Sequence, residues 1–282
     1  MARAAEAAVL DQWYCIGSAA HVPAVPTADR LLGRPLVLGR TAGAVSVHSE
    51  GAALPVRLRY GMVWTTLGAP ERDIVAIPEA AEPDRRAVPC GGVVVNASGL
   101  RIVENFLDMA HFPFVHAGIL GAEPETEVRR YAAEIRRDVD EVWATDCAFF
   151  QPQAAMSARG GLMAEYMYRV PAPFAAILYK TAPASPGRWD VICLFVQPFA
   201  PDRCRAHALL LVLDDTASTA SLVAFQQRIF LQDRIILENQ RPRLLPLEPR
   251  AEIPTRADAS SVAYRRWLKE KGVTYGTVER SN

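Results

Sequence analysis

The alternation of hydrophobic and polar positions divides the chain into a strand-rich first part and a longer region of strands and helices. Apolar and β-branched runs near Leu36 (PLVLGR), Val45 (AVSVH) and Val63 (MVWTTLG) are separated by glycine and proline. Such runs predict short strands joined by turns. Residues 73–92 are rich in proline, alanine and charge, which is typical of a connection. We therefore place a boundary between a first unit, residues 1–85, and a second unit, residues 86–282.

The second unit begins with a strand at residues 92–96 and a helix that starts near Ser98 or Leu100. Pro113 should end or bend that helix, because proline lacks a backbone donor and clashes with the preceding turn. Alternating apolar segments follow, and they predict a meander of at least five antiparallel strands. Those segments are EIRRDVDEVWATDCAFF, LMAEYMYRV, AAILYKTA, WDVICLFVQPF and RAHALLLVLDD. The expected fold class is α+β.

A change in the period of the hydrophobic residues indicates a long helix after the strands. Its apolar positions, largely three, four and seven residues apart, are Leu222, Phe225, Ile229, Phe230, Ile236 and Leu237. This spacing predicts a helix packed against the sheet. Asp233 lies inside the segment, where an ionised carboxylate is costly unless it is paired or bound to metal. Its neighbours Ile235 and Ile236 favour an inward position, and a shorter amphipathic helix should end at Gly272.

The segment ENFLDMAHFPFVH carries the candidate chemistry. His111 and His116 are five residues apart, so a straight helix would separate them by roughly 140°. Pro113 takes the chain off the helical path and lets His116 return toward His111. Asp108, three residues before His111, can accept the other ring N–H of a ligand histidine. Two imidazoles and one carboxylate form the facial triad of mononuclear iron(II) oxygenases, and Asp233 is the expected third ligand.

Other interpretations of these residues are open at this point. Two histidines among aromatic residues are more often packed and hydrogen-bonded than bound to metal, and Asp233 could be a surface acid. The other three histidines are weaker candidates for metal ligands, since His21 and His48 lie in loop-like segments and His207 lies in a strand-like segment. A zinc protease is excluded, because it needs the H-E-x-x-H spacing.

Composition narrows the function classes. Lysine plus arginine equals aspartate plus glutamate at 31 each, so no overall field favours nucleic acid or an anionic membrane. The five cysteines are scattered, and no basic-then-apolar segment marks a secretion signal. The apolar runs are broken well before the roughly 20 residues that span a bilayer. A soluble, cytoplasmic protein without a membrane span is expected.

The sequence resembles the Rieske non-haem iron oxygenases at these residues. Their N-x-x-D-x-x-H-x-x-x-x-H motif is matched by Asn105, Asp108, His111 and His116. Asp233, in FLQDRIILENQ, falls at the iron carboxylate of the family, and ASSVAYRRWL also matches. The resemblance implies a helix-grip catalytic domain that binds Fe(2+). It also implies that Asp108 links an incoming electron to the iron site and that Asn105 lies near it.

The N-terminal unit departs from the family pattern. WYCIGSAAHVP, LLGRPLVLGR and RYGMVWTTLG look like the segments that flank the Rieske cluster. That cluster needs C-x-H followed later by C-x-x-H, whereas only AALPVRL stands between AVSVHSEG and RYGMVWTTLG. The sole C-x-x-H joins Cys204 to His207 and has no C-x-H mate. We therefore expect residues 1–85 to be a truncated Rieske-like β frame, with no [2Fe–2S] cluster on this chain.

A chain without a cluster or a G-x-G-x-x-G fingerprint must receive its electrons from a partner. Within the family it is similar to the cluster-less 7-methylxanthine N-demethylase components of bacterial caffeine degradation. That resemblance implies a Rieske-containing NAD(P)H reductase, a glutathione-transferase-like structural subunit, a homo- or hetero-oligomer, and oxidative N-demethylation with O2 that releases formaldehyde. The alternatives are an O-demethylase or aromatic hydroxylase component, or a catalytically silent subunit. A silent subunit has no physical need to keep the buried polar residues of the triad.

Overall fold

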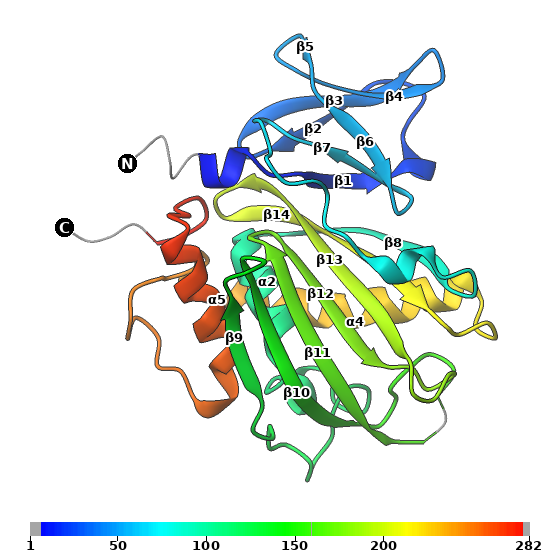
Figure 1. Cartoon of the computed structure of the whole chain (residues 1–282), viewed down its shortest axis with the longest axis vertical. Helices are drawn as coiled ribbons and strands as arrows, with labels where there is room; N and C mark the ends of the chain where they lie inside the picture. Colours follow the sequence, from blue (N-terminus) through cyan, green and yellow to red (C-terminus); the bar gives the residue numbers. More distant parts are fainter. Residues whose placement is uncertain (1–6, 159, 279–282) are drawn as a thin grey trace.

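A seven-stranded antiparallel sheet forms the centre of the computed structural model, which describes residues 7–158 and 160–278 (Figure 1). The strand order is β8-β14-β13-β12-β11-β10-β9, so the first strand of the unit pairs with the last one. The strands are β8 (Arg86–Val95), β9 (Ala132–Arg136), β10 (Glu141–Gln151), β11 (Leu162–Ala172), β12 (Ala175–Thr181), β13 (Trp189–Ala200) and β14 (Arg203–Val212). The predicted α+β class and antiparallel meander are confirmed.

Two small antiparallel sheets precede the large one. The first has the order β1-β7-β6 and the second the order β2-β3-β4-β5. Their strands are β1 (Tyr14–Ser18), β2 (Thr27–Leu31), β3 (Arg34–Thr41), β4 (Ala44–Ser49), β5 (Ala52–Ala53), β6 (Val56–Arg59) and β7 (Met62–Thr65). Four of the hairpins have two-residue loops that end in glycine, and both loop residues have positive φ. This is the backbone that type I′ hairpin turns require, which explains the glycine punctuation of this region.

Helices cover one face and one edge of the large sheet. The helices are α2 (Gly99–Leu107), α3 (Phe112–Val115), α4 (Thr219–Asn239) and α5 (Ala259–Glu270), with 3-10 turns η1 (Ala19–His21), η2 (Pro78–Ala81) and η3 (Arg256–Asp258). In Figure 1, α2 and α4 lie behind the sheet and α5 lies beside β9. Ser98 and Ser218 cap α2 and α4 by accepting the Leu100 and Ser221 N–H groups at 3.2 and 3.1 Å. The long helix and the closing helix were both predicted.

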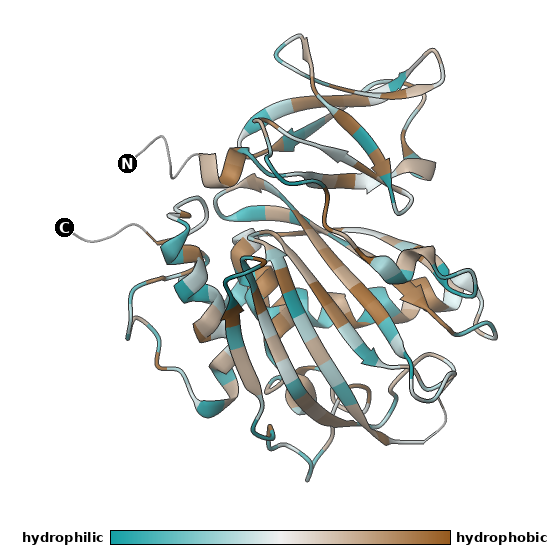
Figure 2. Cartoon of the chain, viewed as in Figure 1, coloured by the Kyte–Doolittle hydropathy of each residue, from teal (hydrophilic) through white to brown (hydrophobic). Residues whose placement is uncertain are grey.

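On the opposite face of the sheet, the part formed by β12 to β14 is covered by the N-terminal strands and the connection that follows them. Trp64, Ile74 and Ile77 pack with Ile177 and other residues of β12 to β14, so every residue of β12 except the last is buried. Figure 2 accordingly shows hydrophobic stretches on the central strands. Burial on both faces explains the nearly continuous apolar sequence of β12.

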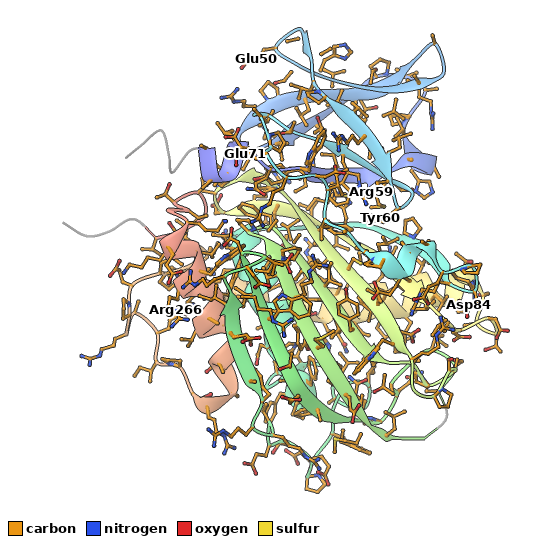
Figure 3. The ribbon with its side chains drawn as sticks, viewed as in Figure 1. Glu50, Arg59, Tyr60, Glu71, Asp84 and Arg266 are labelled. Carbon is orange, nitrogen blue, oxygen red and sulfur yellow. The ribbon has the colours of Figure 1, made fainter. Side chains whose placement is uncertain are left out.

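A tyrosine fixes the connection between the two units. Tyr60 donates its hydroxyl hydrogen to the Val75 carbonyl oxygen at 2.9 Å and accepts the Ile77 N–H at 2.9 Å. Its neighbour Arg59 donates to the Ile74 carbonyl oxygen at 3.0 Å. Figure 3 shows Arg59 and Tyr60 where the N-terminal strands approach the large sheet. The connection is therefore held by defined hydrogen bonds.

Two sequence-based boundaries were wrong. Residues 86–92 belong to β8 rather than to a connection, because Val88 and Cys90 alternate into the interior while the strand pairs with β14. Helix α2 ends at Leu107, well before Pro113. In the described part of the chain, no helix combines the length and apolar character needed to cross a membrane.

Candidate metal centre

A short helix between two histidines brings their rings together. Pro113 lies in the first turn of α3, where its missing N–H is no loss. His111 immediately precedes α3 and His116 immediately follows it. The two Nε2 atoms lie 3.1 Å apart, and the ring centroids lie 5.0 Å apart. The proline thus starts a new helical turn instead of bending α2.

Asp233 reaches the same point from α4. Its Oδ1 atom lies 2.9 Å from His116 Nε2 and 3.3 Å from His111 Nε2. Asp233 is only 7% exposed. Its Oδ1 is buried, and none of the described residues forms a hydrogen bond with it. Two ligand atoms that are each about 2.1 Å from a metal ion, at right angles to each other, lie about 3.0 Å apart. The three atoms therefore have the types and the spacing that a divalent first-row metal requires.

Each histidine has a separate partner at its other ring nitrogen. His111 Nδ1 lies 3.0 Å from Asp108 Oδ2, and His116 Nδ1 lies 2.9 Å from Gln232 Oε1. Asp108 is itself fixed, because its Oδ1 accepts the Ala110 N–H at 2.7 Å. With a proton on each Nδ1, both Nε2 atoms present lone pairs to the shared point. Such partners set the tautomer and ring orientation of metal-binding histidines.

The electrostatics of the centre are those of closely coupled acids and bases. Burial lowers the pKa of His111, but the carboxylates of Asp108 and Asp233 outweigh burial and raise it to about 9. Burial raises the pKa of Asp233, and the two histidines outweigh that effect and lower it. A cation is thus favoured at the meeting point of the three side chains.

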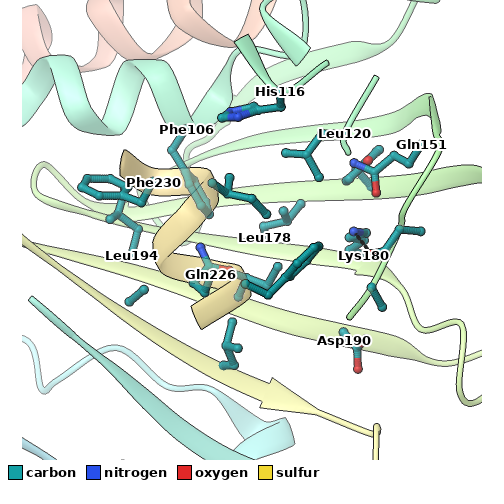
Figure 4. Close-up of a pocket in the computed structure, with 18 of the residues that line it drawn as sticks. Phe106, His116, Leu120, Gln151, Leu178, Lys180, Asp190, Leu194, Gln226 and Phe230 are labelled. Carbon is teal, nitrogen blue, oxygen red and sulfur yellow. Dashed lines mark hydrogen bonds between the residues drawn. The ribbon is translucent and has the colours of Figure 1, made fainter. Parts of the chain in front are cut away.

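A pocket adjoins the centre, between α4 and the face of the large sheet. It contains about 1030 Å³ of space free of protein atoms, a volume that includes open solvent at its mouth. Its aromatic residues are Phe106, Phe112, Tyr166, Tyr168, Phe225 and Phe230. Figure 4 shows His116 at one side of this pocket. A flat, largely apolar molecule could lie here with one end at the histidines.

The structure places each candidate residue. Asn105, on α2, lines the pocket beside the metal centre. Asp108 follows the last residue of α2, so it contacts His111 through a turn rather than along a helix face. Asp233 points inward as expected, but the argument from Ile235 and Ile236 was wrong, since they are 64% and 49% exposed.

Sequence reasoning missed Gln232 and the polar residues of the pocket wall. Gln232 precedes Asp233 directly, and no spacing rule distinguishes it from the other glutamines of α4. The pocket residues come from strands that are distant in sequence and become neighbours only through the sheet register. Alternation along β10, β11 and β12 indicates which residues share a face, although it does not indicate which of them border an opening.

The five cysteines and the remaining histidines lie apart from this centre. All five cysteines are buried and free, and burial raises the pKa of Cys15 and Cys90 to about 12. His207 Nε2 lies 3.0 Å from Gln197 Oε1, and burial lowers the pKa of His207 to about 3. In the described ranges, His111, His116 and Asp233 form the one group of three or more such ligands that converges.

Known proteins resemble the chain in sequence. Residues 95–273 match the Vanillate O-demethylase oxygenase C-terminal domain family. The probable methylxanthine N7-demethylase NdmC of Pseudomonas sp. (strain TJI-51) is 48% identical over 273 residues, which cover 96% of this chain and 97% of that protein. Methylxanthine N3-demethylase NdmB of Pseudomonas putida is 24% identical over 235 residues, 80% of this chain but only 62% of that protein.

Solved structures share the fold. NdmA of Pseudomonas putida CBB5 with caffeine has a TM-score of 0.76 at 18% identity, covering 95% of this chain and 92% of that one. Dicamba monooxygenase bound to dicamba has a TM-score of 0.73 at 18% identity, covering 94% and 97%. With the family match over residues 95–273 and the 48% identity along nearly the whole chain, this protein belongs to the methylxanthine N-demethylase family of Rieske-type oxygenases.

Proposed function

We propose that this chain is the oxygenase component of an N7-demethylase that converts 7-methylxanthine to xanthine and formaldehyde. One observation carries the proposal. Three ligand atoms of the facial-triad type meet at the side of a largely apolar pocket, in a chain 48% identical to a probable methylxanthine N7-demethylase. Under this proposal His111, His116 and Asp233 bind Fe(2+), and Asp108 and Asn105 assist catalysis from the edge of the centre.

A ferrous ion held by these residues would supply the binding and activation of dioxygen, since a three-residue triad leaves coordination positions open. The protein's own contribution is orientation. Asp108 and Gln232 accept the Nδ1–H groups and keep both Nε2 atoms available. The aromatic walls hold a flat ring and exclude water from the reacting methyl group.

The reaction balances only with an external electron donor. One N-methyl group, O2, two electrons and two protons give an N-hydroxymethyl group and water; its C–N bond then breaks to yield formaldehyde and a ring N–H. We propose that a Rieske-containing NAD(P)H reductase supplies the two electrons and that the chain acts in an oligomer, with a glutathione-transferase-like protein as a further subunit. Buried cysteines with raised thiol pKa values support the proposal that no [2Fe–2S] cluster is held here.

An O-demethylase acting on an aromatic acid is the second candidate. The observation that favours it is Lys180, whose buried ammonium lines the pocket and could bind a carboxylate. Asp190 also lines the pocket and pairs in register with Lys180 across β12 and β13. A negative charge is therefore already present beside the lysine, which favours a neutral ring with carbonyl groups over a benzoate.

The test uses the chain reconstituted anaerobically with Fe(II) and mixed with a Rieske-containing reductase, NADH and air-saturated buffer. Xanthine and formaldehyde should form in equal amounts from 7-methylxanthine, and His116→Ala and Asp233→Ala should abolish both. Iron binding without methylxanthine turnover, together with formaldehyde release from a methoxybenzoate, would favour the O-demethylase. Failure to bind iron would favour a silent subunit.

A further inference from the structure

Polar groups at one wall of the pocket remain outside the metal chemistry described above. Gln151 is 1% exposed, lines the pocket, and has a buried Oε1 without a hydrogen-bond partner among the described residues. A buried acceptor left unpaired costs about 1–3 kcal/mol. Because Gln151 lines the pocket, a molecule bound there can supply the missing partner.

Lys180 provides a second polar group at this wall. Its side chain is buried, and the ammonium donates to the carbonyl oxygen of Ala154, three residues after Gln151. An ammonium carries three hydrogens, so further donors are available to a ligand. Lys180 faces Asp190 in the register of β12 and β13, and Asp190 accepts the Leu213 N–H at 2.9 Å. The lysine charge is thus partly balanced before any ligand binds.

The pocket is chemically asymmetric. In Figure 4, Gln151, Lys180 and Asp190 lie on a different side from Phe106 and Phe230. A ligand with one polar edge and one apolar face therefore has only one favourable orientation. Such an arrangement can select which end of the ligand reaches the metal centre, because only a few polar groups are needed to fix orientation in an apolar site.

We propose that Gln151 and Lys180 bind the lactam edge of the substrate, that is, a ring C=O next to a ring N–H, and so direct the opposite N-methyl group toward His111 and His116. The assignment rests on the proposed function, and it adds the residues that determine specificity. The Gln151 carboxamide offers an acceptor for the ring N–H and a donor for the adjacent carbonyl. Lys180 donates to a ring carbonyl oxygen.

This recognition predicts a preference among substrates with the same reacting methyl group. A xanthine with methyl groups at N1, N3 and N7 has no lactam N–H, so it leaves the Gln151 oxygen unpaired. Sites built to hydrogen-bond a ligand N–H reject analogues that lack it far more strongly than apolar pockets reject a methylene. The 7-methyl compound should therefore bind at least tenfold more tightly than the trimethyl compound.

The experiment is anaerobic calorimetric titration of the Fe(II)-loaded chain without reductase, so that ligands bind but do not react. The ligands are 7-methylxanthine, 1,7-dimethylxanthine, 3,7-dimethylxanthine, 1,3,7-trimethylxanthine and a methoxybenzoate. The variants are Gln151→Met, which removes both hydrogen bonds, and Gln151→Glu, which keeps acceptors only. Lys180→Met tests the ammonium. Gln197→Met is the matched control, because Gln197 is a buried sheet glutamine outside the pocket.

Support would be a tenfold or greater preference of the wild type for 7-methylxanthine, lost in Gln151→Met and unchanged in Gln197→Met. Lys180→Met should weaken all four xanthines by similar factors, since all have both carbonyl groups. The dimethylxanthine that binds the wild type more weakly than 7-methylxanthine does identifies which ring N–H is bound. An undiminished preference in folded Gln151→Met, or no preference in the wild type, would overturn the assignment and leave the proposed function standing. Binding of the methoxybenzoate but of no xanthine would overturn both.

Discussion

Each of the two histidines depends on a different neighbour for its orientation. Asp108 offers two oxygens to separate donors, the His111 ring and the Ala110 N–H. Gln232 offers one amide oxygen to His116. A carboxylate also stabilises positive charge on its partner ring, whereas an amide only orients it. The two imidazoles are therefore not equivalent, and changes at their partners should have different consequences.

Asp108→Asn should reduce turnover by about 10–100-fold while the fold and most of the iron are kept. The single amide oxygen can still accept from Ala110, but the amide nitrogen then faces His111 Nδ1–H as a second donor. Turnover with the reductase and iron per chain should be measured together, with exposed Asp84→Asn as the control. Unchanged turnover would remove Asp108 from the mechanism.

Gln232→Leu should lower iron affinity by about 10–100-fold, because His116 loses the acceptor that holds its Nδ1 proton. Gln227→Leu is the matched control on the same helix, since Gln227 donates to the Cys90 carbonyl oxygen at 2.9 Å instead. Competition with a ferrous chelator measures the affinity. Equal effects of the two substitutions would point to a general weakening of α4.

Lys180 should make the stability of the protein increase with pH on the alkaline side. Burial lowers its pKa from the ordinary 10.5 to about 8, although Asp190 opposes the shift. Between those values the unfolded chain binds more protons than the folded chain, so raising the pH favours folding. Relative to Lys180→Met, the wild type should gain about 2 kcal/mol between pH 7 and pH 9.5. Denaturant unfolding at both pH values measures the difference, and a constant difference would contradict the buried ammonium.

Single residues were predictable where their chemistry is rare. Histidines are few in this chain, so their spacing and the nearby Asp108 were informative. Gln232 and Gln151 were not predictable, because glutamine is common and its role depends on neighbours far away in the sequence. Asp233 was placed inward for an incorrect reason, since Ile235 and Ile236 are themselves exposed.

At the scale of the element, the geometry of the histidine pair depends on how closely α3 packs. A Cβ atom on Gly121 would lie 2.6 Å from the Pro113 backbone nitrogen and 2.9 Å from the Phe112 carbonyl carbon. Backbone atoms cannot rotate away as a flexible side chain can. Glycine at this position therefore lets the loop after His116 fold back against α3.

Gly121→Ala should shift α3 and reduce turnover by tenfold or more, because about 1 Å of misplacement can cost 10²-fold in rate. Gly118→Ala is the control from the same loop. Gly118 has a φ of +79° but no atom within 4 Å of its Cβ position, so the change should cost stability without pushing on α3. Turnover and thermal unfolding of both variants separate the effects. Equal losses of turnover would argue against the packing role.

Helices and strands were predictable where the period of the hydrophobic residues and the length of the segment indicated the same element. The large-sheet strands and α4 followed from the change of period from two to 3.6. The end of α2 was not predictable, because the Asp108 carboxylate accepts the Ala110 N–H and stabilises a turn before Pro113. The start of β8 was missed for another reason. Its proline and two glycines resemble a loop, and only pairing with β14 makes residues 86–92 a strand.

For the whole molecule, the two small sheets do more than occupy the N-terminal region. Trp64 of β7, together with Ile74 and Ile77 of the connection, covers β12 to β14 on the face of the large sheet that lies opposite α4. The pocket and metal centre occupy the other face. The N-terminal strands therefore contribute to the core that supports the pocket, whether or not they also contact an electron donor.

The purified chain should show no visible [2Fe–2S] absorption and no NADH-driven turnover until a Rieske-containing reductase is added. A Rieske cluster needs two cysteines and two histidines in one place, whereas in the described ranges the one converging group of three or more histidine, cysteine or acidic ligands is His111, His116 and Asp233. A single iron stores too few electrons for the reaction. Absorption spectra after iron and sulfide reconstitution, and NADH consumption with and without reductase, test this. His116→Ala with reductase controls for uncoupled oxidation, and turnover by the isolated chain with NADH alone would refute the need for a partner.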